Sequence, residues 1–162
     1  MSARASRLSP RDVRLREVAE DDLPILFEHQ RDPVAVRAAR FPGRDRDAFM
    51  AHWHGILRDQ NNICRTVVAA DEVAGNIVCF ERHGVREVGY WIGREHWDRG
   101  VATLALSELV ALVDVRPLYG RVAKDNVSSI RVLEKCGFRL TDEAIGPAEP
   151  EDGVEEVVYR LD

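Results

Sequence analysis

Residues 89–103 hold the pattern in this chain that is best suited to bind an anion. They predict a strand, a short loop and the start of a long helix, with the small residues Gly100 and Ala102 at the helix start. The first backbone N–H groups of a helix have no partner within the helix, and the helix dipole adds positive potential there. Small residues let a phosphate approach those groups closely. The segment therefore predicts a pyrophosphate cradle, with an ordinary helix start as the alternative interpretation.

Two common phosphate motifs do not fit this segment. No Gly-Lys-Ser/Thr follows the loop, which excludes a P-loop. The glycine spacing of the dinucleotide fingerprint is absent, and the strands before the loop are expected to form a meander.

Residues 126–138 form the second informative segment. Asn126 is expected to cap a helix, because its side chain can accept a hydrogen bond from the first turn. Gly137 is expected to end that helix. Taken alone, both residues are explained by helix structure.

Together the two segments resemble the GNAT superfamily of N-acetyltransferases, most closely the branch that acetylates the N-termini of ribosomal proteins. The likeness rests on residues 87–92, 97–103 and 134–138 and on the pair Asn126 and Ser129, in the order and at the separations of that branch.

The resemblance implies an α/β (α+β) fold, with a mixed, mostly antiparallel central sheet of about six to seven strands flanked by about four helices. Two parallel strands, ending near Ile92 and Ala123, would splay apart to form the acyl-CoA site. The implied co-substrate is acetyl-CoA, and the implied acceptor is a primary amine on a protein N-terminus, a small amine, an amino acid or an aminoglycoside-like compound. The implied cofactor-binding residues are Trp91, Ile92, Trp97, Asp98, Arg99, Gly100, Val101, Ala102, Thr103, Asn126 and Ser129.

Several positions depart from the family pattern or leave alternatives open. Many members carry a tyrosine general acid where this chain has Leu133, so Ser129 becomes the candidate for protonating the leaving thiolate. The resemblance points to Glu87 as the general base for the amine, with ion pairing to an arginine as the alternative. Trp97 stands where the wider superfamily often has Gln or Arg. Asp98 brings an acid into the loop, where it would weaken cofactor affinity or cap the helix.

Hydrophobic periodicity predicts the elements that position these residues. Residues 1–12 lack such periodicity and are expected to form a flexible tail before a single domain over residues 13–162. Alternating patterns predict strands over residues 13–18, 63–70, 76–82, 85–92, 116–123, 138–143 and 154–161, with a turn over 71–75. Helical spacing predicts helices that begin near residues 20, 33, 45, 100 and 127.

Composition and residue patterns argue against several classes of protein. The chain has 162 residues and a formal net charge of −5, whereas nucleic-acid binders are more often basic. No apolar run approaches the roughly 20 residues of a membrane span. Three cysteines without clustered spacing indicate a reducing cytoplasm rather than a disulfide framework. His52 and His54 are two residues apart and so point to different faces of a helix, which argues against a metal site.

The leading hypothesis is an acetyltransferase that acts on a primary amine, without a nucleic-acid or membrane partner. One alternative is a non-catalytic acyl-CoA-binding or regulatory domain, which Leu133 favours and which Glu87, Asn126 and Ser129 oppose. Another is an oligomerisation module; a homodimer is compatible with the resemblance. The acidic residues within 149–156 form a solvated loop or, if they border the acceptor cleft, attract a cationic amine.

Overall fold

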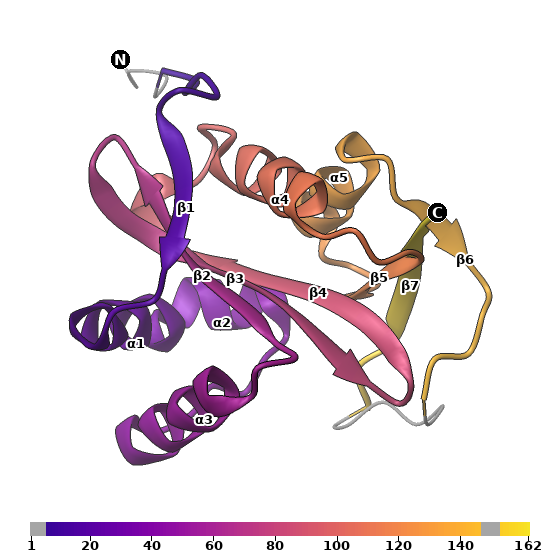
Figure 1. Cartoon of the computed structure of the whole chain (residues 1–162), viewed down its shortest axis with the longest axis horizontal. Helices are drawn as coiled ribbons and strands as arrows, with labels where there is room; N and C mark the ends of the chain where they lie inside the picture. The colour runs from indigo at the N-terminus through magenta and orange to yellow at the C-terminus, as the bar shows by residue number, and fades with distance from the viewer. Residues whose placement is uncertain (1–5, 147–152) are drawn as a thin grey trace.

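Seven strands form one sheet in the computed structural model, which describes residues 6–146 and 153–162 (Figure 1). Their order in the sheet is β1-β2-β3-β4-β5-β7-β6. The strands are β1 (Val13–Glu17), β2 (Ile63–Ala69), β3 (Glu72–Arg82), β4 (Val85–Ile92), β5 (Leu118–Ala123), β6 (Arg139–Thr141) and β7 (Glu156–Leu161). The helices are α1 (Leu23–Arg31), α2 (Pro33–Ala39), α3 (Arg46–Arg58), α4 (Val101–Leu112) and α5 (Val127–Lys135), with short 3-10 turns η1 (Glu20–Asp22) and η2 (Arg94–His96).

Helices cover both faces of this sheet. α1, α2 and α3 lie on one face, and α4 and α5 lie on the other (Figure 1). Each face buries its own apolar cluster, with Leu106 and Leu109 of α4 in the larger cluster and Leu26 and Phe49 in the smaller one. Because side chains alternate between the two faces of a strand, neighbouring residues of β4 contact opposite layers. None of the helices described is both long enough and apolar enough to cross a membrane.

The neighbouring strands are antiparallel except for β4 and β5. These two parallel strands pair over residues 86–88 of β4 and 118–120 of β5. Within the described chain they make no further pairing, although β4 continues to Ile92 and β5 to Ala123. The expected mixed, mostly antiparallel sheet with a splayed parallel pair is therefore confirmed. Five described helices flank it, where the family resemblance implied about four.

The turn between β2 and β3 lies earlier than the sequence predicts. Ala70 and Asp71 have positive φ angles of 49° and 65° and close a two-residue hairpin. The turn expected over residues 71–75 is thus wrong, and most of that segment belongs to β3. Gly75 is needed there for close packing, because a Cβ on it would lie 2.2 Å from the Trp91 carbonyl oxygen.

A partly buried ion pair joins the first helical turns to the sheet. Asp22, which is 4% exposed, accepts hydrogen bonds from both terminal nitrogens of Arg16 at 2.7 and 2.8 Å. The same carboxylate accepts from the Ala19 backbone N–H and from the Thr66 hydroxyl, each at 2.8 Å. Burial by itself raises the pKa of Asp22, but these bonds outweigh it and hold the pKa below its usual value.

Asp22→Asn is expected to lower the free energy of unfolding by about 2–4 kcal/mol, because it leaves the Arg16 guanidinium without its charged partner. Urea unfolding measures the change. Because folding lowers the pKa of Asp22, its contribution is present above about pH 4 and is lost as the pH falls through the folded-state pKa. The exposed Arg14–Asp71 pair, at 4.0 Å, supplies the control. Equal losses from Asp22→Asn and Asp71→Asn would contradict this account.

Candidate functional site

A cavity of about 510 Å³ opens where β4 and β5 diverge. Its walls come from the end of β4, the loop that leads into α4, the first turns of α4 and α5, and one side of α2. The lining residues are Arg7, Ala35, Ala38, Ala39, Tyr90, Trp91, Ile92, His96, Trp97, Asp98, Gly100, Val101, Ala102, Thr103, Asn126, Ser128, Ser129, Arg131, Val132 and Lys135.

The start of α4 presents backbone donors to this cavity. Leu104 N–H makes the first bond within the helix, to Gly100 O at 3.1 Å, so the N–H groups of residues 101–103 have no intrahelical partner. Gly100 is left-handed, with a φ of 80°, and no described side chain caps the helix. A Cβ on Gly100 would meet no described atom within 4 Å. The predicted cradle is therefore open to an anion, and the suggestion that Asp98 caps α4 is wrong.

Trp97 braces the loop before α4 against the end of β4. Its indole N–H donates to Ile92 O at 2.8 Å, and Gly93 N–H donates to Ala74 O of β3 at 2.8 Å. Hydrogen bonds alternate in direction along an antiparallel strand, so the backbone groups of Tyr90 and Ile92 face away from β3, toward the gap beside β5. The tryptophan that departs from the wider superfamily pattern thus fixes the point where the loop leaves the strand.

The N-terminal segment holds the same loop from outside. Leu8 N–H donates to Arg99 O at 3.0 Å, and the Leu8 side chain packs against the larger core cluster. Arg7 lines the cavity beside it. Residues 6–12 therefore contact the fold, although the sequence predicts a flexible tail there; residues 1–5 lie outside the described chain. Among the residues predicted to bind the cofactor, Arg99 is the one that is absent from the described lining of the cavity.

Ser129 and Tyr90 meet at the wall of the cavity. Asn126 caps α5, because its Oδ1 accepts from Ser129 N–H at 3.3 Å. The Tyr90 hydroxyl lies 2.7 Å from Ser129 Oγ. Burial, the largest influence, raises the pKa of Tyr90 to about 12. β4 and the first turn of α5 therefore bring two hydroxyl groups, one each, to the same cavity as the anion cradle.

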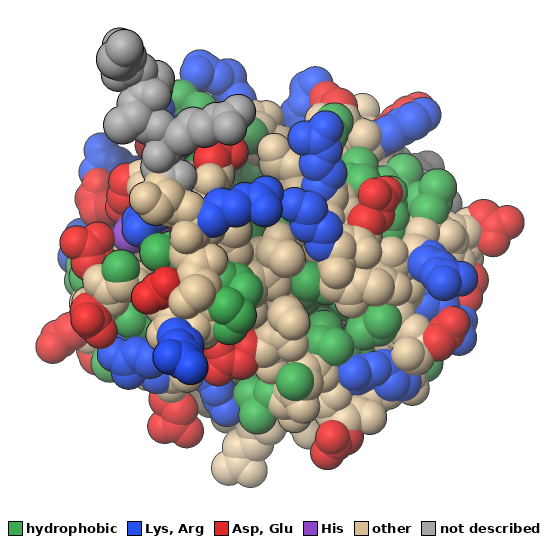
Figure 2. Space-filling model, turned by 90° about the horizontal axis from the view of Figure 1, so that it is seen from above, with side chains coloured by type: hydrophobic (Ala, Val, Ile, Leu, Met, Phe, Trp, Pro, Cys, Tyr) green, Lys and Arg blue, Asp and Glu red, His purple; other side chains and the backbone are tan. Residues whose placement is uncertain are grey.

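Basic side chains surround the cavity. Arg131 and Lys135 lie one turn apart on α5, and Arg7 comes from the N-terminal segment. Figure 2, which looks onto the layer of α4 and α5, shows Lys and Arg side chains crossing this face. Asp98 is the one carboxylate among the described lining residues. Three cationic side chains against one carboxylate favour an anionic ligand.

Glu87 lies apart from the cavity and is 1% exposed. Arg82 donates to its two carboxylate oxygens through Nε at 2.8 Å and through Nη2 at 3.0 Å. Arg121 Nε lies 3.4 Å from the oxygen that accepts from Nη2. Both oxygens thus accept from guanidinium groups, which favours the ion-pair interpretation. A role for Glu87 as general base stays a prediction.

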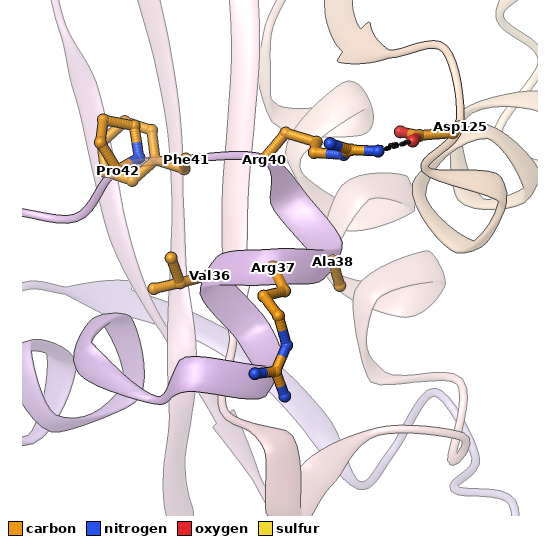
Figure 3. A pocket seen from close by; sticks show the side chains of 7 residues that line it. All are labelled: Val36, Arg37, Ala38, Arg40, Phe41, Pro42 and Asp125. Carbon is orange, nitrogen blue, oxygen red and sulfur yellow. Dashed lines mark hydrogen bonds and ion pairs between the residues drawn. The ribbon is translucent and has the colours of Figure 1, made fainter. Parts of the chain in front are cut away.

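A second hollow of about 600 Å³ lies beside the end of α2 (Figure 3). There Arg40 reaches across to Asp125, with Nη2 2.6 Å from Oδ2. Ala38 lines both this hollow and the cavity. Phe41, which lines the hollow, packs edge-on against Trp91, which lines the cavity, at 5.9 Å between ring centroids. The two spaces are therefore neighbours.

Sequence reasoning missed several of the lining residues. Arg131 and Lys135 share a helix face with Ser128, so helical spacing could have found them. Alternation along β4 could have placed Tyr90 on the same face as Ile92. No sequence pattern places Arg7 or α2 at the cavity, because those contacts depend on how distant segments pack. Of the predicted acidic segment, residues 147–152 lie outside the described chain.

Comparison with known families agrees with this geometry. A profile of the GNAT acetyltransferase domain matches residues 12–139, so the chain belongs to the GNAT family of acetyltransferases. Among curated proteins, the chain is 26% identical over 138 residues to N-acetyltransferase p20 of Bacillus licheniformis, with 77% of this chain and 78% of that protein covered.

Solved structures share the fold. A GNAT-family acetyltransferase from Bacillus anthracis superposes with a TM-score of 0.74 at 16% identity, covering 93% of this chain and 94% of that one. Spermidine N-acetyltransferase from Vibrio cholerae, solved with CoA and spermine, superposes with a TM-score of 0.72 at 18% identity and the same two coverages. At these identities the likeness establishes the architecture.

Glu87→Gln is expected to lower the free energy of unfolding by about 2–4 kcal/mol, because Arg82 and Arg121 would face a neutral amide. Its effect on the shape of the pH–rate profile decides whether Glu87 is also the general base. Urea unfolding and thiol release from acetyl-CoA across pH measure the two effects. Glu81→Gln, on the exposed part of β3, is the control. A profile that loses its acidic limb while stability is retained would instead support Glu87 as the base.

Proposed function

We propose that this protein transfers the acetyl group of acetyl-CoA directly to a primary amine. The observation that carries the proposal is the anion cradle at the start of α4, which opens into the cavity between two diverging strands. Membership of an acetyltransferase family supports the same reaction, and the Vibrio cholerae relative was solved with CoA.

The cradle suits the pyrophosphate of acetyl-CoA. The backbone N–H groups of residues 98–103 would donate to its oxygens, with the Thr103 hydroxyl as a further donor. Arg7, Arg131 and Lys135 would offset the charge of the cofactor phosphates. The backbone of Ile92 faces the gap and would continue the hydrogen bonding of the sheet with the pantetheine amides. The thioester would then lie beside Ser129.

Acetyl transfer forms one bond and breaks one. A neutral amine nitrogen attacks the thioester carbonyl carbon, the C–N bond forms, and the C–S bond breaks. The Ser129 hydroxyl donates a proton to the leaving CoA sulfur, the nitrogen loses its proton to water, and the serine regains a proton from that water. A backbone N–H near Ile92 would stabilise the oxyanion of the intermediate. Holding the two reactants together supplies about 7–11 kcal/mol in well-oriented systems, so an ion-paired Glu87 is compatible with turnover.

The acceptor would approach from the second hollow. The Phe41–Trp91 contact joins this hollow to the cavity that would hold the thioester, and Asp125 places a carboxylate at the edge of the hollow. Arg40 already pairs with this carboxylate and Arg37 lines the same hollow, so its charged side chains do not by themselves select a cationic amine. Spermine in the Vibrio cholerae structure supports a small polyamine-like acceptor. The resemblance to the branch that acetylates the N-termini of ribosomal proteins supports a peptide N-terminus.

Thiol release from acetyl-CoA tests the reaction, with spermine, free amino acids and short peptides with free N-termini as separate acceptors. Release above the rate without amine, together with an acetylated product by mass spectrometry, is expected for at least one class. CoA binding without turnover of any amine would favour a non-catalytic acyl-CoA-binding domain. Failure to bind CoA in calorimetry would contradict both functions.

Gly100→Glu is expected to weaken CoA binding by roughly 100-fold or more, because it places bulk and negative charge against the pyrophosphate. Gly84→Glu is a matched control: Gly84 has a φ of +79°, close to the +80° of Gly100, and a Cβ on either would meet no described atom within 4 Å. The backbone strain of the two variants is therefore similar. Calorimetric titration of CoA compares them, and equal affinities would overturn the assignment of the cradle.

A further inference from the structure

We infer that Tyr90 is a positioning residue for Ser129: its phenol donates to Ser129 Oγ and so directs the serine's own hydrogen toward the sulfur of bound CoA. The inference rests on the proposed function and concerns one hydrogen bond within that site. Nothing in the sequence motif distinguishes Tyr90 from a residue that only packs against the core.

The geometry joins the two side chains from different layers. Tyr90 belongs to β4 and Ser129 to the first turn of α5, and both line the cavity. The oxygen–oxygen distance of 2.7 Å is that of a well-formed hydroxyl hydrogen bond. The backbone of Ser129 is held independently, because its N–H donates to Asn126 Oδ1 at 3.3 Å. Ser129 is thus held by two separate contacts, one on its main chain and one on its side chain.

A hydroxyl group has one hydrogen and two lone pairs, so the pair has two arrangements. In one, Tyr90 donates to Ser129 Oγ at 2.7 Å, and the serine hydrogen is free to point into the cavity. In the other, Tyr90 donates to Ser129 O at 3.2 Å, and the serine hydrogen points back to the phenol. Both arrangements use the 2.7 Å contact, with opposite donors, and an incoming sulfur that needs a donor selects the first.

The protonation state of Tyr90 agrees with this role. Burial raises the pKa of Tyr90 to about 12, so the phenol keeps its hydrogen at neutral pH and acts as a donor. The position where the family pattern has a tyrosine general acid holds Leu133, which is 2% exposed. The available hydroxyl therefore lies one turn earlier on α5, and it needs a partner that sets its direction.

Titration of the thiol of bound CoA tests the inference and needs no acceptor amine. A hydrogen bond donated to the sulfur favours the thiolate and lowers the thiol pKa. We expect Tyr90→Phe to raise the pKa of the bound thiol by about 0.5–1, the effect of one typical hydrogen bond. Thiolate absorbance in the ultraviolet follows the titration. CoA affinity at a pH where the thiol is neutral is expected to stay within about threefold of wild type, because one bond to a neutral thiol is weak.

The double variant separates positioning from simple stabilisation. Ser129→Ala removes the donor itself and is expected to raise the thiol pKa at least as much as Tyr90→Phe. If Tyr90 acts through Ser129, adding Tyr90→Phe to Ser129→Ala causes no further change. Additive shifts in the thiol pKa would overturn the inference.

Tyr159→Phe is the matched control. Tyr159 of β7 also ties the sheet to α5 through its phenol, which donates to Glu134 Oε1 at 3.2 Å. Loss of the Tyr159 hydroxyl is expected to lower the free energy of unfolding about as much as loss of the Tyr90 hydroxyl. It is expected to leave the pKa of the bound CoA thiol unchanged. Equal thiol pKa values in Tyr90→Phe and wild type would also overturn the inference. Failure of wild type to bind CoA would instead contradict the proposed function.

Discussion

The structure depends on the divergence of β4 and β5 after three paired positions. A strand that leaves its neighbour exposes backbone donors and acceptors, which are costly to bury without partners. In this chain, Trp97 satisfies the Ile92 carbonyl, and the remaining groups face a cavity of about 510 Å³. The divergence thus creates the space for a long ligand and leaves the backbone groups that our proposal assigns to the amides of acetyl-CoA.

The two helices that follow the diverging strands supply the rest of the site. α4 follows β4 and presents free N–H groups at Gly100, and α5 follows β5 and presents Ser129. In our proposal, α4 binds the phosphates and α5 lies beside the reacting sulfur. Both helices begin at the open end of the strands. The sheet therefore fixes the distance between the N–H groups at the start of α4 and the Ser129 hydroxyl.

Local sequence predicted the elements and the anion cradle, because alternation, helical spacing and small residues at a helix start are all encoded over short distances. The hairpin at Ala70 was misplaced, since Gly75 serves a contact with β4 rather than a turn. Glu87 of β4 pairs with Arg82 at the end of β3 and with Arg121 of β5. Contacts of this kind arise from the register of the sheet, which composition and motif spacing do not specify.

The most direct test of the account is a crystal structure of the protein with CoA. We predict that the pyrophosphate lies within hydrogen-bonding distance of the N–H groups of residues 98–103, and that the sulfur lies beside Ser129 Oγ between the diverging strands. CoA bound outside this cavity, or with its sulfur directed away from α5, would contradict the account.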